Sequence, residues 1–228
     1  LLKTIDAPVD PHRELSVFTI SATTENEAAP AFLFRSFPNN PLGASVVTNM
    51  LGSCRRRYAL AMGLDPAASV RQLVIQTREL MVARLPPIEV APDTAPVNKV
   101  IRTGPDIDLT QLPVPTFWPG DGGPYIGTAN VVMTRGPDSQ RINLGCYRQM
   151  LHGPNKVGLY ITAVKHGRLD RDTWWQRGEP CEVVAAFGVD PVLFMMAGSG
   201  FGKDVSELDV AGGIMGRPVE LARGVSGS

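Results

Sequence analysis

Cysteine and histidine are scarce in this sequence, which has three of each among 228 residues. The cysteines, Cys54, Cys146 and Cys181, are odd in number and show no Cys-x-x-Cys spacing, which disfavours both a disulfide framework and a structural zinc site. Such a set of cysteines fits a reducing cytoplasm. The histidines form no His-x-x-x-His or Glu-x-x-His pair, so spacing alone indicates no metal site.

Long apolar runs and an excess of charge are also missing. No run approaches the roughly 20 residues of a membrane-spanning helix, and the N-terminus lacks the features of a signal peptide. The 22 basic residues balance the 22 acidic ones, so no net charge favours nucleic acid or an anionic membrane surface. We therefore expect a cytoplasmic protein without a nucleic-acid partner and without a membrane span.

Glycine and proline, by contrast, are abundant, with 23 and 20 residues, and hydrophobic residues make up 43% of the chain. This composition is sufficient for a core and favours many turns and short elements, which indicates the α+β class. Four prolines between residues 86 and 96 disfavour regular structure there and suggest a connector. We predict two domains, an N-terminal α+β domain over residues 1–105 and a second domain over 106–228.

Local patterns predict individual elements. Asp190 before Pro191, and Ser206 before an apolar stretch, are typical of helix N-termini. The three consecutive arginines at 55–57 are predicted to be a solvated helix face. Further predictions are helices over 53–62 and 70–81, strands over 31–34 and 157–164, a hairpin joining 128–133 to 141–146, and a buried strand over 183–189.

The stretch from Arg141 to His166 combines an amide, arginines and two histidines with a glycine, a turn and an apolar run. A purely structural segment seldom needs this mixture, so we expect chemistry here. The glycine-rich run 198–203 has neither the P-loop spacing nor the dinucleotide-binding spacing. Cys146, near Arg148, has the pattern of an activated thiol, but an ordinary buried cysteine is the favoured interpretation.

A series of separate motifs extends in order over nearly the whole chain: Asn39–Gly43, Asn49–Ser53, Asp121–Ile126, Asn143–Arg148, Val157–His166 and Val205–Gly212. In these motifs the chain resembles the UbiD-type decarboxylases, which use prenylated FMN and a divalent metal to decarboxylate aromatic, heteroaromatic or α,β-unsaturated acids reversibly. The resemblance implies that the second domain is part of a flavin-binding split β-barrel domain. It also implies that the protein acts on a small carboxylic acid and CO₂ and receives its cofactor from a flavin prenyltransferase. The full-length protein is expected to be a homo-oligomer.

The resemblance further assigns site residues. It implies that Mn²⁺ is held against the cofactor phosphate by Asn143, His166 and Glu207, a mixed oxygen and imidazole set that manganese accepts. Arg148 is the expected catalytic residue, with a charge suited to the substrate carboxylate and the flavin. A monovalent cation such as K⁺ is expected near the phosphate. The other expected cofactor contacts are Cys146, Tyr147, Lys165, Ala197, Gly198 and Ser199.

One feature of the family is missing from these residues. Its proton-donating glutamate lies in a segment of the type Glu-Gly-Pro-x-Gly-Glu, and no Gly-Pro pair in this sequence follows a glutamate. We therefore expect a chain that holds the metal and flavin half of a carboxy-lyase, with its C-terminal part and C-terminal domain absent, and that is incomplete for catalysis by itself. Two alternatives remain open, a non-catalytic flavin- or phosphate-binding module and a truncated or structural homologue whose cofactor site is a relic.

Overall fold

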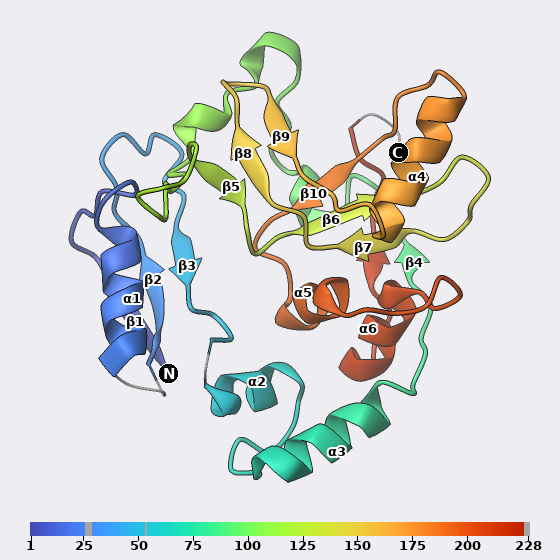
Figure 1. The fold of residues 1–228 in the computed structure, drawn as a ribbon, viewed down its shortest axis with the longest axis horizontal. Coiled ribbons are helices and arrows are strands. Elements are labelled where there is room, and N and C mark those ends of the chain that lie inside the picture. The colour runs from blue at the N-terminus through green and yellow to red at the C-terminus, as the bar shows by residue number, and fades with distance from the viewer. Residues whose placement is uncertain (26–28, 53, 226–228) are drawn as a thin grey trace. The chain divides into compact units, whose positions relative to one another are not determined.

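The computed structural model describes residues 1–25, 29–52 and 54–225, which form helices and short strands (Figure 1). The prediction of an α+β fold class is confirmed. Ser53, which ends one motif and begins one predicted helix, lies outside the described residues, as do residues 226–228. Within the described ranges, no helix is both long and apolar enough to cross a membrane.

Contacts between Cα atoms divide the chain into two compact units whose segments alternate along the sequence. Unit 1 comprises Leu1–Val70, Gly104–Ile126 and Gln149–Leu159, and unit 2 comprises Arg71–Thr103, Gly127–Arg148 and Tyr160–Ser228. The sequence predicts two domains that follow one another along the chain and meet at residue 105, whereas each of these units combines three separate segments. The predicted boundary stays a prediction.

The described residues of unit 1 form two three-stranded sheets and two α-helices, which are labelled in Figure 1. In the first sheet, of order β1-β2-β3, β1 is parallel and β3 antiparallel to the central strand. The second sheet has the order β5-β8-β9. The elements are β1 (Leu2–Ile5), α1 (Leu15–Glu25), β2 (Ala31–Phe34), β3 (Val46–Thr48), α2 (Arg55–Ala61), β5 (Tyr125–Gly127), β8 (Gln149–Leu151) and β9 (Val157–Leu159), with 3-10 turns at Gly104–Asp106 and Leu109–Gln111.

The core of unit 1 explains both a correct prediction and a missed element. The predicted strand at 31–34 is β2, whose apolar side chains enter a buried cluster formed by Val9, Leu15, Phe32, Phe34 and Phe37. Helix α1 was not predicted, because its many β-branched residues give it no helical periodicity of apolar positions. Burial of its first residue, Leu15, in this cluster supplies the stabilisation that local propensity lacks.

The prediction of a solvated arginine face over 55–57 is wrong for Arg57. Arg55 and Arg56 are exposed, but Arg57 is only 8% exposed. Its guanidinium donates hydrogen bonds to the backbone carbonyls of Met50, Ala29 and Asn49 at 2.9, 2.7 and 3.1 Å. Because a guanidinium presents several donors in a fixed fork, one side chain satisfies carbonyls from separate loops.

Unit 2 is built around the three-stranded antiparallel sheet β10-β6-β7. The predicted hairpin is confirmed in its pairing, since Val132 of β6 lies opposite Gly145 of β7. The predicted buried strand over 183–189 is wrong in length and burial, because β10 is a three-residue edge strand with exposed and half-buried residues. The elements are α3 (Val70–Leu80), β4 (Ile88–Glu89), a 3-10 turn (Pro96–Asn98), β6 (Val131–Thr134), β7 (Asn143–Gly145), α4 (His166–Gln176), β10 (Val184–Ala186), α5 (Pro191–Gly198), α6 (Glu207–Met215) and β11 (Glu220–Leu221).

Two helix starts in unit 2 follow the predicted capping chemistry. The Asp190 side chain accepts from the backbone N–H of Val192 at 2.8 Å and begins α5. Ser206 Oγ accepts from the N–H of Asp209 at 3.2 Å and begins α6. The predicted strand over 157–164 ends early at Leu159, and α4 begins at His166.

The chain after α3 lies directly against α6, within unit 2. The backbone N–H of Leu85 donates to the carbonyl of Asp209 at 2.9 Å. A Cβ atom added to Gly212 would lie 2.4 Å from the carbonyl oxygen of Leu85, and one added to Gly213 would lie 2.5 Å from that of Ala83. Helix and connector therefore touch backbone to backbone, and the proline-rich connector then forms the short strand β4, parallel to β11.

Candidate functional site

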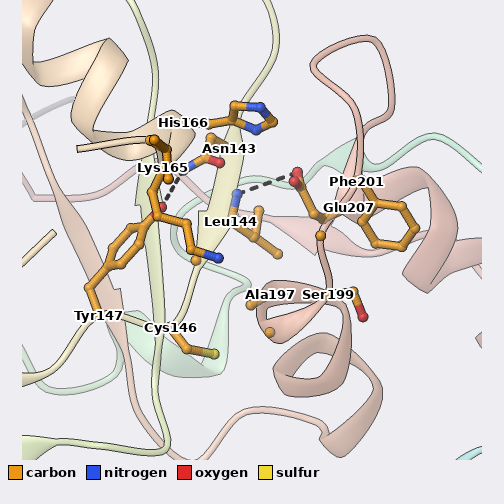
Figure 2. A pocket seen from close by; sticks show the side chains of 14 residues that line it. Asn143, Leu144, Cys146, Tyr147, Lys165, His166, Ala197, Ser199, Phe201 and Glu207 are labelled. Carbon is orange, nitrogen blue, oxygen red and sulfur yellow. Dashed lines mark hydrogen bonds between the residues drawn. The ribbon is translucent and has the colours of Figure 1, made fainter. Parts of the chain in front are cut away.

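A cavity of about 260 Å³ in unit 2 gathers side chains from four elements (Figure 2). They come from β7 and the loop after it, the start of α4, the end of α5, and the start of α6. Apart from Arg148, all the site residues expected from the sequence line this cavity: Asn143, Cys146, Tyr147, Lys165, His166, Ala197, Gly198, Ser199 and Glu207. Segments up to 64 residues apart in sequence thus meet at one place.

Asn143 is held by a buried network on the β7 side of the cavity. The side chain is 2% exposed, and its Nδ2 donates to Thr134 Oγ1 at 3.0 Å and to the Tyr147 hydroxyl at 3.4 Å. That hydroxyl also accepts from the backbone N–H of Gly167 at 3.3 Å. Tyr147 therefore connects Asn143 to the first turn of α4, which begins with His166.

Glu207 and His166 share one neighbour, Arg141. Glu207 is 2% exposed, and Arg141 NH2 donates to its Oε1 and Oε2 at 2.8 and 3.1 Å. The same nitrogen lies 3.3 Å from His166 Nδ1. Since a buried carboxylate requires a compensating positive charge, the guanidinium explains how Glu207 is tolerated at this depth.

The donor set fits a divalent cation. Asn143, His166 and Glu207 offer an amide oxygen, an imidazole nitrogen and a carboxylate, which suit manganese. Among the described residues, no three His, Cys, Asp or Glu side chains form a metal cluster, and the candidate set contains only two residues of those types. The carboxylate of Glu207 is already paired with the Arg141 guanidinium at 2.8 Å.

The cavity also has features that suit a phosphate. Helix α4 begins at His166 after its N-cap residue Lys165, and both residues line the cavity. The partial positive charge of a helix N-terminus, together with a lysine, favours an anion there. On the other side, Ala197, Gly198 and Ser199 end α5, where the Ser199 hydroxyl donates to the Met195 carbonyl at 2.9 Å.

Cys146 has the environment of an inert thiol. Burial raises the pKa of its thiol above the ordinary value, and the charge of Lys165 opposes this shift only in part. A raised pKa keeps the sulfur protonated near neutral pH, and the protonated form is not the nucleophile. These surroundings agree with the interpretation of Cys146 as an ordinary cysteine and not an activated thiol, although it is half-buried and not buried.

Arg148, the expected catalytic residue, is not among the described residues that line the cavity. It is exposed, and its guanidinium carbon lies 4.9 Å from the centre of the Tyr160 ring. This is a cation–π contact of the kind that arginine makes at surfaces. The role expected for Arg148 stays a prediction.

Three residues that surround the cavity without lining it were not predicted from the sequence: Arg141, Thr134 and Asp170. Arg141 stands two residues before Asn143, and residues two apart in extended chain point to the same side, so this spacing was a usable signal. Thr134 faces Asn143 across the β6-β7 pairing. The Thr134 hydroxyl in turn donates to Asp170 Oδ2 at 2.6 Å. Asp170 lies four residues after His166, one helical turn away, and local sequence gives no indication of this contact.

Comparisons with known proteins cover both ends of the chain. A family model described as UbiD, 3-octaprenyl-4-hydroxybenzoate carboxy-lyase Rift-related domain, matches residues 88–227. A second, described as UbiD_N, the N-terminal domain of 3-octaprenyl-4-hydroxybenzoate carboxy-lyase, matches residues 1–75.

Solved structures are similar over almost the whole chain. An evolved dimeric form of the UbiD-class enzyme HmfF from Pelotomaculum thermopropionicum, in complex with prFMN, has 28% identity and a TM-score of 0.85, with 98% of this chain and 49% of that chain covered. The apo 3,4-dihydroxybenzoic acid decarboxylase AroY from Klebsiella pneumoniae has 26% identity and a TM-score of 0.83, with 99% and 47% covered. The vanillic acid decarboxylase of Sedimentibacter hydroxybenzoicus, at 24% identity, shares the fold with a TM-score of 0.90, with 98% and 47% covered. The chain therefore spans about half the length of these solved chains.

Proposed function

Because this chain belongs to the UbiD family of carboxy-lyases, we propose that it forms the metal- and flavin-binding part of a decarboxylase. The proposed reaction is the reversible, non-oxidative decarboxylation of an aromatic, heteroaromatic or α,β-unsaturated carboxylic acid with prenylated FMN and Mn²⁺. The observation that carries the proposal is that Asn143, His166 and Glu207, from three separate elements, line one cavity. The relatives with prFMN or FMN bound support the choice of cofactor.

Each residue has a defined task in this proposal. Asn143, His166 and Glu207 hold the divalent cation, and Lys165 with the N-terminus of α4 neutralises the cofactor phosphate. The loop of Cys146 and Tyr147 and the end of α5 at Ala197–Ser199 line the flavin and phosphate, with a monovalent cation such as K⁺ nearby. When bound, prenylated FMN supplies the electron sink for the loss of CO₂. Arg148 attracts the substrate carboxylate by its charge.

A binding-only function is the second candidate, and one observation favours it. No Gly-Pro pair in these 228 residues follows a glutamate, so the expected proton-donating segment is not found among them. For the isolated chain we therefore expect metal and flavin binding without complete turnover. Release of CO₂ from a cinnamic or aromatic acid by the reconstituted chain would contradict the binding-only function.

The metal ligands are tested by substitution. Asn143→Ala, His166→Ala and Glu207→Ala should each lower Mn²⁺ affinity by at least about tenfold, because each removes one ligand of a small set. Titration followed by electron paramagnetic resonance of free Mn²⁺, with and without FMN, measures this affinity. FMN retention should fall in parallel, since the cation is proposed to bridge protein and phosphate.

Two matched variants control for nonspecific effects. His152→Ala removes an exposed histidine in the turn between β8 and β9, and Asp209→Asn changes an acidic residue of α6 that does not line the cavity. Both should bind Mn²⁺ as the wild type does. Unchanged Mn²⁺ and FMN binding in all three alanine variants would rule out this site.

The proposal also includes the cellular compartment, the cofactor supply and the oligomeric state of the full-length protein. We place it in the cytoplasm, where a flavin prenyltransferase supplies the cofactor, and we propose a homo-oligomer for the full-length form. The free thiols of all three cysteines support a reducing compartment. The dimeric relative supports self-association.

A further inference from the structure

We infer that Thr134 and Asp170 are positioning residues that fix the amide of Asn143 with its oxygen toward the cavity. The inference rests on the proposed metal site and deepens it, because an asparagine binds a hard cation through its oxygen and not through its nitrogen. The nitrogen and oxygen of an amide have nearly the same size, so packing alone does not choose between the two orientations. Hydrogen bonds must make this choice.

The direction of the hydrogen bonds follows from the chemistry of the partners. Thr134 is 3% exposed, and its Oγ1 lies 2.6 Å from Asp170 Oδ2. An ionised carboxylate only accepts, so the single hydroxyl proton of Thr134 is committed to Asp170. Thr134 Oγ1 is then left as an acceptor, and the Asn143 atom 3.0 Å away must be the donating Nδ2.

The Tyr147 hydroxyl can also accept from the amide in this orientation. The backbone N–H of Gly167 can only donate, so the Tyr147 hydroxyl accepts from it at 3.3 Å. The hydroxyl keeps a further lone pair for Asn143 Nδ2 at 3.4 Å. Figure 2 shows the amide nitrogen directed toward Tyr147 and the amide oxygen on the side of His166 and Glu207.

The arrangement also joins two ligands of the proposed metal site. Asp170 lies on α4, one turn after His166, and Thr134 lies on β6 opposite Asn143 in the strand register. The helix that supplies the imidazole therefore also supplies the carboxylate that orients the amide. Asp170 and Thr134 do not line the cavity, so they act through Asn143 and not on the metal.

The test uses two substitutions that disturb the network in different ways. Thr134→Val keeps the shape but removes the hydroxyl. Asp170→Asn introduces a donor that can bond to Thr134 Oγ1, which frees the threonine proton for Asn143 and allows the amide to turn. Each variant should lose Mn²⁺ affinity by about tenfold to a hundredfold, as is usual when residues that orient metal ligands are changed.

Two further variants separate positioning from general damage. Thr134→Ser retains the hydroxyl and should restore binding close to that of the wild type. Asp172→Asn changes a carboxylate of the same helix that pairs with Arg168 and Arg171, and should leave Mn²⁺ affinity unchanged. A loss of affinity in Thr134→Ser or in Asp172→Asn equal to that in Asp170→Asn would overturn the inference.

A readout without metal tests the orientation directly. In the nitrogen-15 spectrum of the metal-free protein, the side-chain amide protons of Asn143 should be protected from exchange, and they should lose protection in Thr134→Val and Asp170→Asn. Unchanged protection in both variants overturns the inference, even if Asn143, His166 and Glu207 are shown to be ligands. If the wild type binds no Mn²⁺, the proposed function fails, and the exchange measurement alone decides the orientation.

Discussion

Arg141 is the residue whose charge makes the buried carboxylate of Glu207 possible. Arg141→Met should lower the free energy of unfolding of the metal-free chain by about 3 kcal/mol or more, because it leaves a buried charge unpaired. Added Mn²⁺ would place a positive charge beside Glu207 again, so the difference from the wild type should shrink. Urea denaturation with and without Mn²⁺ measures both effects.

The exposed Arg217 offers a matched control for this experiment. Arg217→Met removes the same charge and adds the same side chain at the surface, and it should change the free energy of unfolding little. Equal stability of Arg141→Met and the wild type without metal would show that Glu207 does not depend on this guanidinium.

The thiol of Cys146 gives a prediction on pH. Burial raises its pKa, so the folded state favours the protonated form, and the stability from this thiol is present at low pH and lost as pH rises through the raised pKa. The pH midpoint for alkylation of Cys146 by iodoacetamide should therefore lie higher in the folded chain than in urea, as followed by mass spectrometry. Lys165→Gln should move it higher still, and coinciding midpoints in folded and unfolded chain would refute the shift.

Among the secondary-structure elements, β7 and α4 meet the Tyr147 ring at glycines. A Cβ atom on Gly167 would lie 2.8 Å from the ring, and one on Gly145 would lie 2.2 Å from it. Gly167→Ala should thus lower the free energy of unfolding by about 1 to 3 kcal/mol through overpacking. Gly202→Ala, in open space, is the control in thermal denaturation, and equal stability of the two variants would show that the ring moves aside freely.

Elements set by local chemistry were the ones that the sequence could predict. The starts of α5 and α6 depend on Asp190 and Ser206, which bond to N–H groups two or three residues away. Helix α1 and the buried Arg57 depend instead on distant partners, such as the cluster around Leu15 and the carbonyl of Ala29. No local pattern carries that information, so these features required the tertiary structure.

The residues of the candidate site can likewise be separated into those that the sequence predicted and those that it did not. Nine of the predicted residues line one cavity, because the family resemblance supplied long-range information that composition and spacing lack. Arg148 was placed by the same resemblance, yet it contacts Tyr160 outside the cavity. The pairing of Thr134 with Asp170 spans 36 residues and could not be read from either segment alone.

At the scale of the whole molecule, the two units interleave along the chain. Unit 1 needs β5, β8 and β9, which follow residue 105, and Phe117 packs against its core cluster. A fragment of residues 1–105 should therefore melt less cooperatively than the intact chain, as circular dichroism would measure. A fragment of residues 1–160, which includes all segments of unit 1, is the control. A transition of 1–105 as sharp as that of 1–160 would instead support a domain boundary at residue 105.

The contact of α6 with the connector limits how this sequence can evolve. Every amino-acid replacement of glycine adds at least a Cβ atom, and at Gly212 and Gly213 that atom would meet backbone oxygens that no rotamer change can move. No other amino acid fits at either position without this clash, so we expect natural selection to remove mutations that replace these two glycines. Gly120 and Gly202, which have open space around them and do not line the cavity, should tolerate replacement. A library that saturates all four codons should therefore recover substitutions at Gly120 and Gly202 far more often than at Gly212 and Gly213.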